Sequence, residues 1–437
     1  MTSQRESQRG HVSYGDHTPR LHRPEPGRRS AIPGVGERLA GGRYEVIEVL
    51  GVGGMSTVLG AFDRDIERPV ALKILHDAGG AAALLDEARI LAAAQSPHVV
   101  SVYALHLDAS PPFLVMERVY GMSLDRMLRE SPPSWIGGMS LLSRIAHALD
   151  VLHDRGITHG DVKAANVLID HGGEVKLADL GITPLLRRAG EGDVFGTPLY
   201  MPPERARGIT VPDALLSRGD VYSFAVLVFV VLARRAPFVD ASSHELIRRH
   251  AVEAPPALSS LCTLPAVLDA PLARALSKDP RARHARAGEL MRELQRAARG
   301  VGPDGRPVHA LVVDDDDDHR ELLMSVLATE LSGARVASAR NGSDALAQIA
   351  IDPPTVLILD LSMPGLAGIP LVARVLALSP STHVVVVTGQ GSGRERQAAA
   401  LLGVRHFLIK PVEPAELARC VLDCISPLED GWPAPSA

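Results

Sequence analysis

The chain has 437 residues and is 46% hydrophobic, with 46 lysines and arginines against 51 aspartates and glutamates for a net charge of −5. This length and composition predict two or three globular domains and exclude wholesale disorder and collagen-like repeats. Because the net charge is small and no basic stripe is present, nucleic acid and anionic membranes are not expected as partners.

The sequence also predicts where the protein resides. Its longest apolar run, Phe224 to Ala233, is well short of the roughly 20 residues that span a bilayer, so no membrane span is expected. The first 40 residues are too polar for a signal peptide, and three cysteines are too few for a disulfide framework. We therefore expect a cytoplasmic protein, and the sequence leaves its oligomeric state open.

The amino-terminal part of the chain divides into an arm and a larger domain. Residues 1–40 are rich in arginine, histidine, glycine and proline and are expected to form a disordered arm. From residue 41 to 298, strand-like runs such as Val70 to Leu75 precede long helical patterns such as Asp220 to Ala233. This order predicts a small β-rich lobe followed by a helical lobe.

The carboxy-terminal part of the chain has a different pattern. Residues 299–308 are dense in glycine and proline, so we expect a linker, and its shortness indicates that the flanking domains touch. From residue 309 to 426, short apolar runs alternate with helical segments, which predicts a parallel sheet covered by helices. Residues 427–437 are expected to be a loose tail.

A glycine-rich segment lies between the first two strand-like runs of the larger domain. Gly51, Gly53 and Gly54 would let backbone N–H groups approach phosphates, although a plain glycine-rich hairpin explains the segment equally well on its own. Lys73 follows on the next expected strand, and Glu87 lies in the helical pattern after it. A lysine held by a glutamate is a positioned cation for phosphate groups.

Three side chains further along supply the remaining parts that phosphoryl transfer requires. Asp161 can accept a proton from a hydroxyl group, and Asn166 and Asp179 offer oxygens to Mg²⁺. In this order the motifs resemble the protein kinase family, specifically the eukaryotic-like bacterial serine/threonine kinases, over residues 41 to 298. The resemblance implies the bilobal α+β kinase fold and transfer of the γ-phosphoryl group of ATP to serine or threonine of protein substrates.

The resemblance also assigns roles to individual residues. Asp161 would be the catalytic base, and Lys163 would steady the γ-phosphoryl group. Lys73, paired with Glu87, would hold the α- and β-phosphates of ATP. The residues expected to bind ATP are Gly51, Val52, Gly53, Gly54, Met55, Ser56, Thr57, Val58, Ala71, Lys73, Glu117 and Val119.

Other positions match the family or depart from it. By the resemblance Glu204 is expected to pair with Arg283, and Asp220 is expected to anchor the catalytic loop. Gly160 stands where many kinases carry an arginine that receives a phosphorylated activation loop, and no serine, threonine or tyrosine lies between Pro184 and Phe195. Because both the receiving arginine and a hydroxyl group to carry the phosphate are missing, we predict that activation-loop phosphorylation does not switch the kinase.

A second constellation begins with five consecutive aspartates. Asp314 to Asp318 follow the apolar run Leu311 to Val313, so they are either a solvated charge run or an acid pair at the end of a strand. Later strand-like runs end at Asp360, at Thr388 and next to Lys410. An acid pair, a lone aspartate, a hydroxyl and a lysine at four successive strand ends resemble the receiver domain of two-component response regulators.

This second resemblance implies a flavodoxin-like (βα)5 doubly wound α/β fold over residues 309 to 426, in which Asp360 is the phospho-acceptor that becomes an acyl phosphate. It also implies a Mg²⁺ site beside that aspartate. The expected metal ligands are Asp314, Asp315, Asp360 and the backbone carbonyl of Ser362, and the expected contacts to the phosphoryl oxygens are Thr388 and Lys410.

Together the two resemblances predict a hybrid signalling enzyme that uses ATP and Mg²⁺. Aspartyl phosphorylation of its own receiver domain would regulate the kinase in a phosphorelay. The phosphate would come from a separate histidine kinase, a phosphotransfer protein or a small acyl phosphate. Two alternatives remain open: a pseudokinase scaffold whose receiver docks two-component partners, and two active domains that are tethered without coupling.

Overall fold

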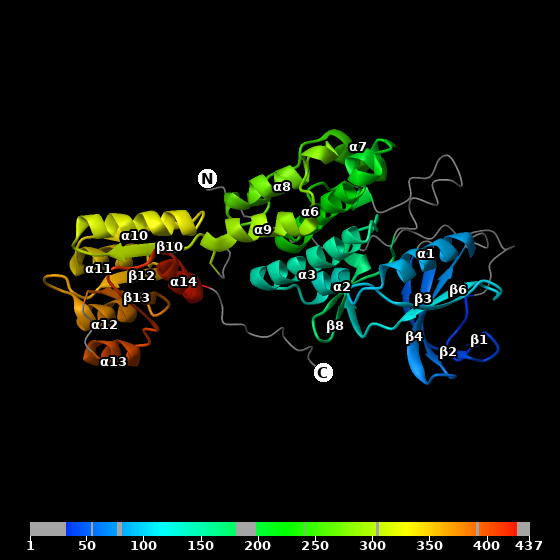
Figure 1. Cartoon of the computed structure of the whole chain (residues 1–437), viewed down its shortest axis with the longest axis horizontal. Coiled ribbons are helices and arrows are strands. Elements are labelled where there is room, and N and C mark those ends of the chain that lie inside the picture. The colour runs from blue at the N-terminus through cyan, green and yellow to red at the C-terminus, as the bar shows by residue number, and fades with distance from the viewer. Residues whose placement is uncertain are drawn as a thin grey trace, which may run out of the picture.

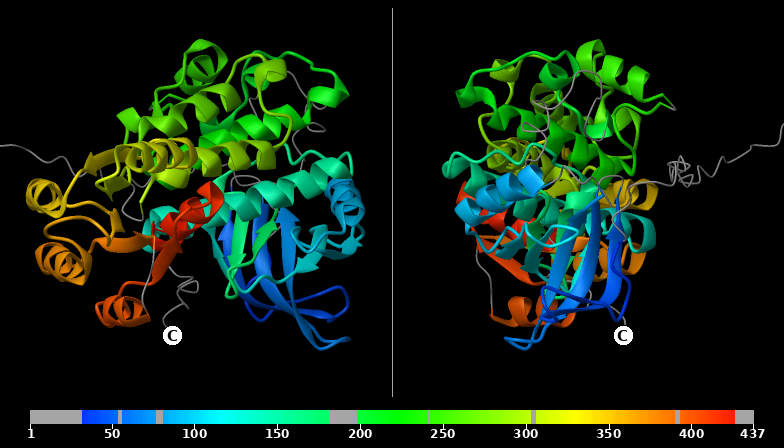
Figure 2. Two further views of the ribbon diagram at one scale, coloured as in Figure 1. Left: turned by 60° about the vertical axis from the view of Figure 1, so that its left-hand side comes forward. Right: turned by 90° about the vertical axis from the view of Figure 1, so that its right-hand side faces the viewer.

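The computed structural model describes residues 32–53, 56–76, 81–180, 198–240, 242–302, 306–389 and 393–425. These residues form an N-lobe, a helical C-lobe and a carboxy-terminal α/β domain. Figure 1 shows the C-lobe between the other two, and Figure 2 shows the same three bodies from two further sides. Residues 1–31 of the expected arm and the whole of the expected tail lie outside the described residues.

The N-lobe is built on one antiparallel sheet with the strand order β1-β2-β3-β4-β6-β5. Alternation along β4 sends Val70, Leu72 and Ile74 into the apolar core on one side of the sheet. The other side is covered by α1, Ala81–Ala94. The strands are β1 Arg38–Leu39, β2 Tyr44–Val52, β3 Ser56–Asp63, β4 Arg68–Leu75, β5 Val102–His106 and β6 Phe113–Glu117.

The first strand corrects the expected boundary of the arm. Arg38 and Leu39 pair with Glu45 and Tyr44, so the ordered part of the chain begins before residue 41. The Gly36 N–H also donates to the Val46 carbonyl at 2.9 Å. Apolar periodicity could not reveal this strand, because it has only two residues and is paired with β2 along the backbone.

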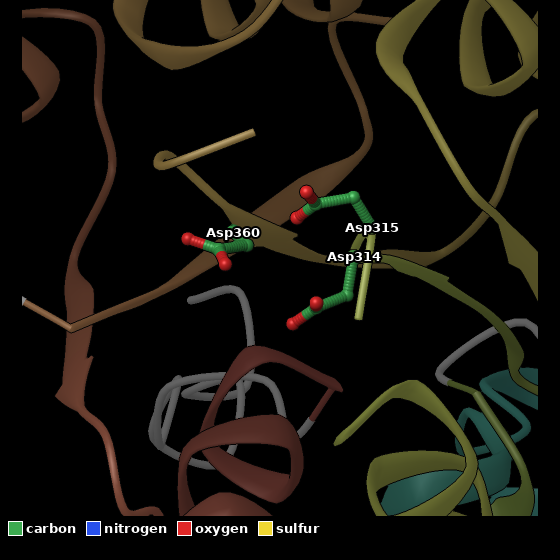
Figure 3. A group of neighbouring side chains, drawn as sticks. All are labelled: Asp314, Asp315 and Asp360. Atoms are coloured by element: carbon green, nitrogen blue, oxygen red, sulfur yellow. The ribbon is translucent and has the colours of Figure 1, made fainter. Parts of the chain in front are cut away.

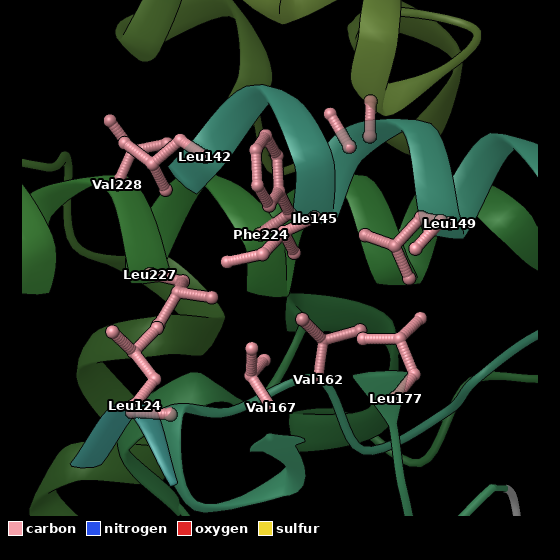
Figure 4. Close-up of a cluster of buried hydrophobic side chains, with 14 of the residues drawn as sticks. Leu124, Leu142, Ile145, Leu149, Val162, Val167, Leu177, Phe224, Leu227 and Val228 are labelled. Carbon is pink, nitrogen blue, oxygen red and sulfur yellow. The ribbon is translucent and has the colours of Figure 1, made fainter. Parts of the chain in front are cut away.

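The C-lobe packs its helices around α6, which is buried along most of its length. Figure 4 shows Phe224 and Leu227 of this helix among apolar side chains of α3 and of the loop and strands below. The segment Asp213–Ala233 is long and apolar enough to cross a membrane by length and composition alone, but 67% of an 18-residue stretch within it is buried inside the structure. The helices are α2 Leu124–Glu130, α3 Trp135–Asp154, α5 Pro203–Ala206, α6 Ser217–Ala233, α7 Ser243–Val252, α8 Asp269–Ala275 and α9 Ala287–Ala297.

A small sheet and several 3-10 turns complete the C-lobe. The strands β7 Gly121–Ser123, β8 Val167–Asp170 and β9 Val175–Leu177 form a small antiparallel sheet. The chain leaves the lobe through the 3-10 turn η7, Ala298–Gly300, which directly follows α9.

The carboxy-terminal domain is a parallel sheet with the order β11-β10-β12-β13-β14 and helices on both faces, as the flavodoxin-like expectation required. Apolar residues of α10 and α14 cover one face, and those of α11 and α12 cover the other. The strands are β10 His309–Val313, β11 Arg335–Ala339, β12 Val356–Asp360, β13 His383–Thr388 and β14 His406–Ile409. The helices are α10 Asp317–Glu330, α11 Gly342–Ile351, α12 Gly368–Leu378, α13 Gly393–Leu401 and α14 Pro414–Ile425.

Candidate active site

The first candidate site centres on Lys73, whose position follows from the pleat of β4. Because Val70, Leu72 and Ile74 face the apolar core, Lys73 points to the opposite side, toward α1. Its Nζ lies 2.6 Å from Glu87 Oε1 of that helix and 2.9 Å from Asp179 Oδ1. The expected pair of Lys73 and Glu87 is therefore present, and Asp179 joins it from a distant part of the sequence.

Burial makes the electrostatics of this cluster strong. Lys73 and Glu87 are almost completely buried. Burial alone would lower the pKa of Lys73, but Asp179 and Glu87 outweigh it and raise that pKa. Burial opposes ionisation of Asp179, and Lys73 still holds the pKa of this carboxyl below its ordinary value. Lys73 is therefore a fixed cation beside an ionised aspartate.

The pKa of Glu87 is shifted in the opposite direction from that of Asp179, and the shift predicts how kcat depends on pH. Burial raises the pKa of Glu87 to about 6 in spite of the neighbouring Lys73. The side chain is charged above this value, so lowering the pH through it removes the charge that holds Lys73. We expect kcat to fall about tenfold for each pH unit below that pKa, measured between about pH 5 and pH 8. Glu87→Gln should have low activity without this acid limb, and a wild-type profile that is flat through the same range would contradict the role of Glu87.

The segment from His159 to Asn166, which we call the catalytic loop, brings three expected residues together. Lys163 Nζ lies 2.7 Å from Asp161 Oδ2. The Asn166 amide donates to the Asp161 backbone carbonyl at 2.9 Å and to its carboxylate at 3.1 Å. The carboxylate of Asp161 is thus oriented by a cation and an amide, which is what a positioned proton acceptor needs.

Asp220 anchors the start of this loop, as expected. Its carboxylate accepts the backbone N–H groups of His159 at 2.7 Å and Gly160 at 2.8 Å, and it lies 2.9 Å from His153 Nε2. Burial opposes ionisation of Asp220, but these partners hold the pKa of the carboxyl below its ordinary value. Gly160 itself has a φ of +74°, a conformation that favours glycine.

Replacing this glycine should therefore destabilise the protein. We expect Gly160→Ala to lower the free energy of unfolding by about 1 kcal/mol, because a Cβ is strained in the left-handed region. Urea unfolding followed by the fluorescence of Trp135, which lies in α3, would measure it. Gly137→Ala in the same helix is the matched control, since its methyl group would meet nothing closer than 3.4 Å. Equal effects of the two substitutions would contradict the strain.

Arg205 lies near this loop and was not predicted from the sequence as a partner of it. The Arg205 guanidinium donates a hydrogen bond to the Gly160 carbonyl, although the two residues are 45 positions apart. Arg205 follows Glu204 on the short helix α5, and no motif marks it as a partner of the catalytic loop. The expected pair of Glu204 and Arg283 is present and bidentate, with N–O distances of 2.9 and 2.7 Å.

Several of the expected ATP-binding residues lie on the strands of the N-lobe. Residues at the ends of β2 and β3 pair as a hairpin, with Gly51 opposite Val58 and the Gly53 N–H donating to the Ser56 carbonyl at 2.8 Å. Ala71 is buried on β4. At the end of β6, the Glu117 N–H donates to the Ser101 carbonyl at 2.8 Å. Gly54 and Met55 lie outside the described residues, as does the segment 181–197 on which the activation-loop prediction depends.

The second candidate site lies at the carboxyl edge of the parallel sheet. Val313 pairs with Leu359, so Asp314 and Asp360 emerge side by side where β10 and β12 end. One carboxylate oxygen from each of Asp314, Asp315 and Asp360 lies within 4.8 Å of the others. Figure 3 shows the three side chains around one space. The five aspartates are therefore not a plain charge run, because the first two lie beside Asp360 in a cluster of three carboxylates that we call the acid pocket.

Side chains from the next two strand ends complete this pocket. Lys410 follows β14 and places its Nζ 2.9 Å from Asp314 Oδ2 and 2.6 Å from Asp360 Oδ2. Thr388 is buried at the end of β13, and its hydroxyl lies 3.5 Å from that of Ser362. The Ser362 N–H donates to Asp360 Oδ1 at 2.8 Å. All the expected receiver residues thus meet at one sheet edge.

The charges in the acid pocket fit a hard divalent cation. Three carboxylates face a single lysine, and the donors are all oxygens, which Mg²⁺ prefers. Burial opposes ionisation of Asp314, but Lys410 and His319 hold the pKa of this carboxyl below its ordinary value. Asp314 is therefore an ionised oxygen ligand at neutral pH. His319, whose Nδ1 lies 2.6 Å from Asp314 Oδ2, was not anticipated from the sequence.

Comparison with known proteins agrees with the two kinds of domain. The family model of the protein kinase domain matches residues 44–292, and that of the response regulator receiver domain matches residues 310–422. The chain belongs to the protein kinase family, with a receiver domain following the kinase domain.

Among curated relatives, the chain is similar to the serine/threonine-protein kinase PknB of Mycobacterium tuberculosis, with 34% identity over 309 residues that cover 67% of this chain and 48% of PknB. It is also similar to the serine/threonine-protein kinase pkn2 of Myxococcus xanthus, with 35% identity over 270 residues that cover 57% of this chain and 32% of pkn2. The chain therefore spans about half or less of the length of these relatives.

Proposed function

We propose that the protein is a serine/threonine kinase that transfers the γ-phosphoryl group of ATP to protein substrates in the cytoplasm. The observation that carries this proposal is the contact of Lys73 with both Glu87 and Asp179, which holds a cation ready for the phosphates of ATP. Asn166 and Asp179 are suited to hold Mg²⁺, which would supply charge neutralisation at the phosphates. Asp161 would then accept the proton of the substrate hydroxyl.

The test is incubation of the full chain with γ-labelled ATP, Mg²⁺ and a general protein substrate. We expect label that survives acid, as serine and threonine esters do, and no such label with Lys73→Met or Asp179→Asn. Asp154→Asn is the matched control, because this aspartate is half-exposed and paired with Arg286 at the surface. Binding of ATP without any transfer to protein would contradict the proposal and favour the pseudokinase scaffold.

We further propose that phosphorylation of Asp360 regulates the kinase. The acid pocket supports this proposal, because Asp360 lies beside Lys410 and within reach of the hydroxyl pair of Thr388 and Ser362. A separate histidine kinase, a phosphotransfer protein or a small acyl phosphate would be the donor. The family's aspartyl chemistry transfers the phosphoryl group to a carboxylate oxygen and releases the donor's leaving group.

Acetyl phosphate tests this regulation directly. With Mg²⁺ present, the wild-type chain should acquire one acid-labile phosphate, and Asp360→Ala should acquire none. Asp352→Ala, at an exposed aspartate that pairs with Arg335, is the control and should be labelled like the wild type. Label on Asp360→Ala would contradict the assignment of the acceptor.

A further inference from the structure

The kinase and receiver domains are joined by close packing in the described part of the linker. Val301 and Pro307 form an antiparallel bridge, and the Gly302 N–H donates to the Arg306 carbonyl at 2.7 Å. Val301 and Val308 are buried, and the Val308 N–H donates to the Gly300 carbonyl at 2.8 Å. These contacts hold the described residues of the linker, 299–302 and 306–308, close together at the junction of the two domains.

Two glycines make the contact between the domains. A methyl group on Gly300 would lie 2.3 Å from the Ser332 carbonyl oxygen and 2.6 Å from the Ala334 nitrogen, so the backbones of the two domains touch there. A methyl group on Gly333 would lie 2.8 Å from Val267 in the C-lobe. We call these contacts of Gly300 and Val267 with residues 331–334 the joint. An ion pair of Arg299 with Glu330 at 3.7 Å lies beside the joint, but it is half-exposed and contributes little.

The helix α10 leads from the acid pocket to the joint. Its amino-terminal turn is tied to Asp314 by His319, by Arg320, whose Nη1 donates to the Asp314 carbonyl at 2.9 Å, and by Asp316, whose N–H donates to Asp314 Oδ1 at 2.9 Å. Its carboxy-terminal end, at Glu330, runs into the residues of the joint. The helix has 14 residues, or about 21 Å at 1.5 Å per residue. Leu323 and Leu327 pack it rigidly against the sheet.

A change in the acid pocket would alter the contacts that hold the first turn of α10. Asp314 Oδ2 is shared between His319 of α10 and Lys410, whose Nζ also contacts Asp360. A phosphoryl group on Asp360 would compete for Lys410, and the charge that Asp314 presents to the first turn of α10 would change. Such a differential contact is what any switch requires.

On the kinase side, the joint leads toward the buried ion pair of Arg283 and Glu204. Val267 lies in the 3-10 turn η5, Ala266–Leu268, which continues directly into α8. The chain after α8 provides the Ser277 carbonyl, which accepts from Arg283 Nε at 2.8 Å. Arg283 in turn holds Glu204 on α5.

We propose that α10 is the element through which the receiver acts on the kinase: a change at the acid pocket reaches the C-lobe through the joint at Gly300 and Val267. This inference rests on the proposed regulation by Asp360 and specifies its route. The contacts form an unbroken path from the acid pocket to the C-lobe. The experiment must measure whether the acid pocket and the kinase active site are energetically coupled along it.

The experiment compares three full-length chains, each with and without acetyl phosphate, in a kinase assay with a general protein substrate. Labelling of Asp360 is measured in the same samples. We expect the wild type to change its rate about fivefold or more when Asp360 is labelled. Gly300→Ala should be labelled equally and keep its basal rate, but its rate should no longer respond, because the added methyl group forces the joint apart. Gly137→Ala, a helical glycine with room for a methyl group, should respond like the wild type.

The outcomes separate the two proposals. If the wild type and Gly300→Ala respond equally, the joint is not the route, while regulation by Asp360 stands. If labelled wild type shows no change in rate, regulation by Asp360 is wrong and the route falls with it. Should Gly300→Ala fail to fold, Val267→Ala takes its place, since it removes the contact with Gly333 without adding atoms, and a full response in that variant overturns the joint.

Discussion

Asp161→Asn should lower kcat of the kinase by about 10²- to 10⁴-fold, the range for removing a positioned general base. The substitution keeps the size of the side chain and an oxygen that can still accept from Lys163 and Asn166. What is lost is the ability to take the proton of the substrate hydroxyl. Because that interaction develops only in the transition state, kcat and kcat/KM should fall together while KM stays near its original value.

Steady-state kinetics on a protein substrate would measure this effect. The binding of ATP should be unchanged, since Asp161 is not among the residues expected to hold the nucleotide. The surface substitution Asp154→Asn controls for loss of a carboxylate in the same lobe. A fall in activity of less than about tenfold would mean that Asp161 does not act as the base.

Arg283→Ala should lower the free energy of unfolding by about 3 to 5 kcal/mol, which is the usual cost of removing one partner of a buried ion pair. Arg283 and Glu204 are both buried and bind through two nitrogen–oxygen pairs. Arg283 also donates to the Arg218 carbonyl at 2.9 Å and to the Ser277 carbonyl. Truncation would leave the Glu204 carboxylate and these carbonyls without their partner in the protein interior.

The chain provides its own control for this prediction. Arg286 and Asp154 form an ion pair at the surface of the same lobe, with both side chains about half exposed. Arg286→Ala should therefore cost about 1 kcal/mol or less. Urea unfolding of both variants gives the comparison, and equal losses of stability would show that Arg283 contributes no more than a surface charge.

The sequence pattern could place several of the candidate site residues because they lie on regular strands or at the ends of them. The strand pattern around Lys73 predicts that this lysine lies on a strand. The strand pattern of the receiver predicts that Asp360 lies at the carboxyl edge of the sheet. The strands β1 and β11 are among those that the sequence pattern did not reveal. Neither β1 nor β11 carries a continuous apolar run, and both are held by backbone hydrogen bonds at sheet edges.

The contacts that connect the sites could not be predicted. Arg205 reaches Gly160 and His319 reaches Asp314 only because the fold brings helix ends beside loops. The glycines of the linker were interpreted as breakers, which is what their residue type indicates. Their close approach to the receiver depends on how two finished domains pack, and Gly300 has no sequence feature that distinguishes it from a glycine in an open turn.

The most direct test of the account is the rate at which the full chain transfers labelled phosphate from ATP to serine and threonine of a protein substrate, measured before and after Asp360 is labelled with acetyl phosphate. We predict a measurable rate of acid-stable labelling in both preparations, and a different rate in each. The absence of acid-stable label in both preparations, with ATP bound, would contradict the account and assign the chain to the scaffold class.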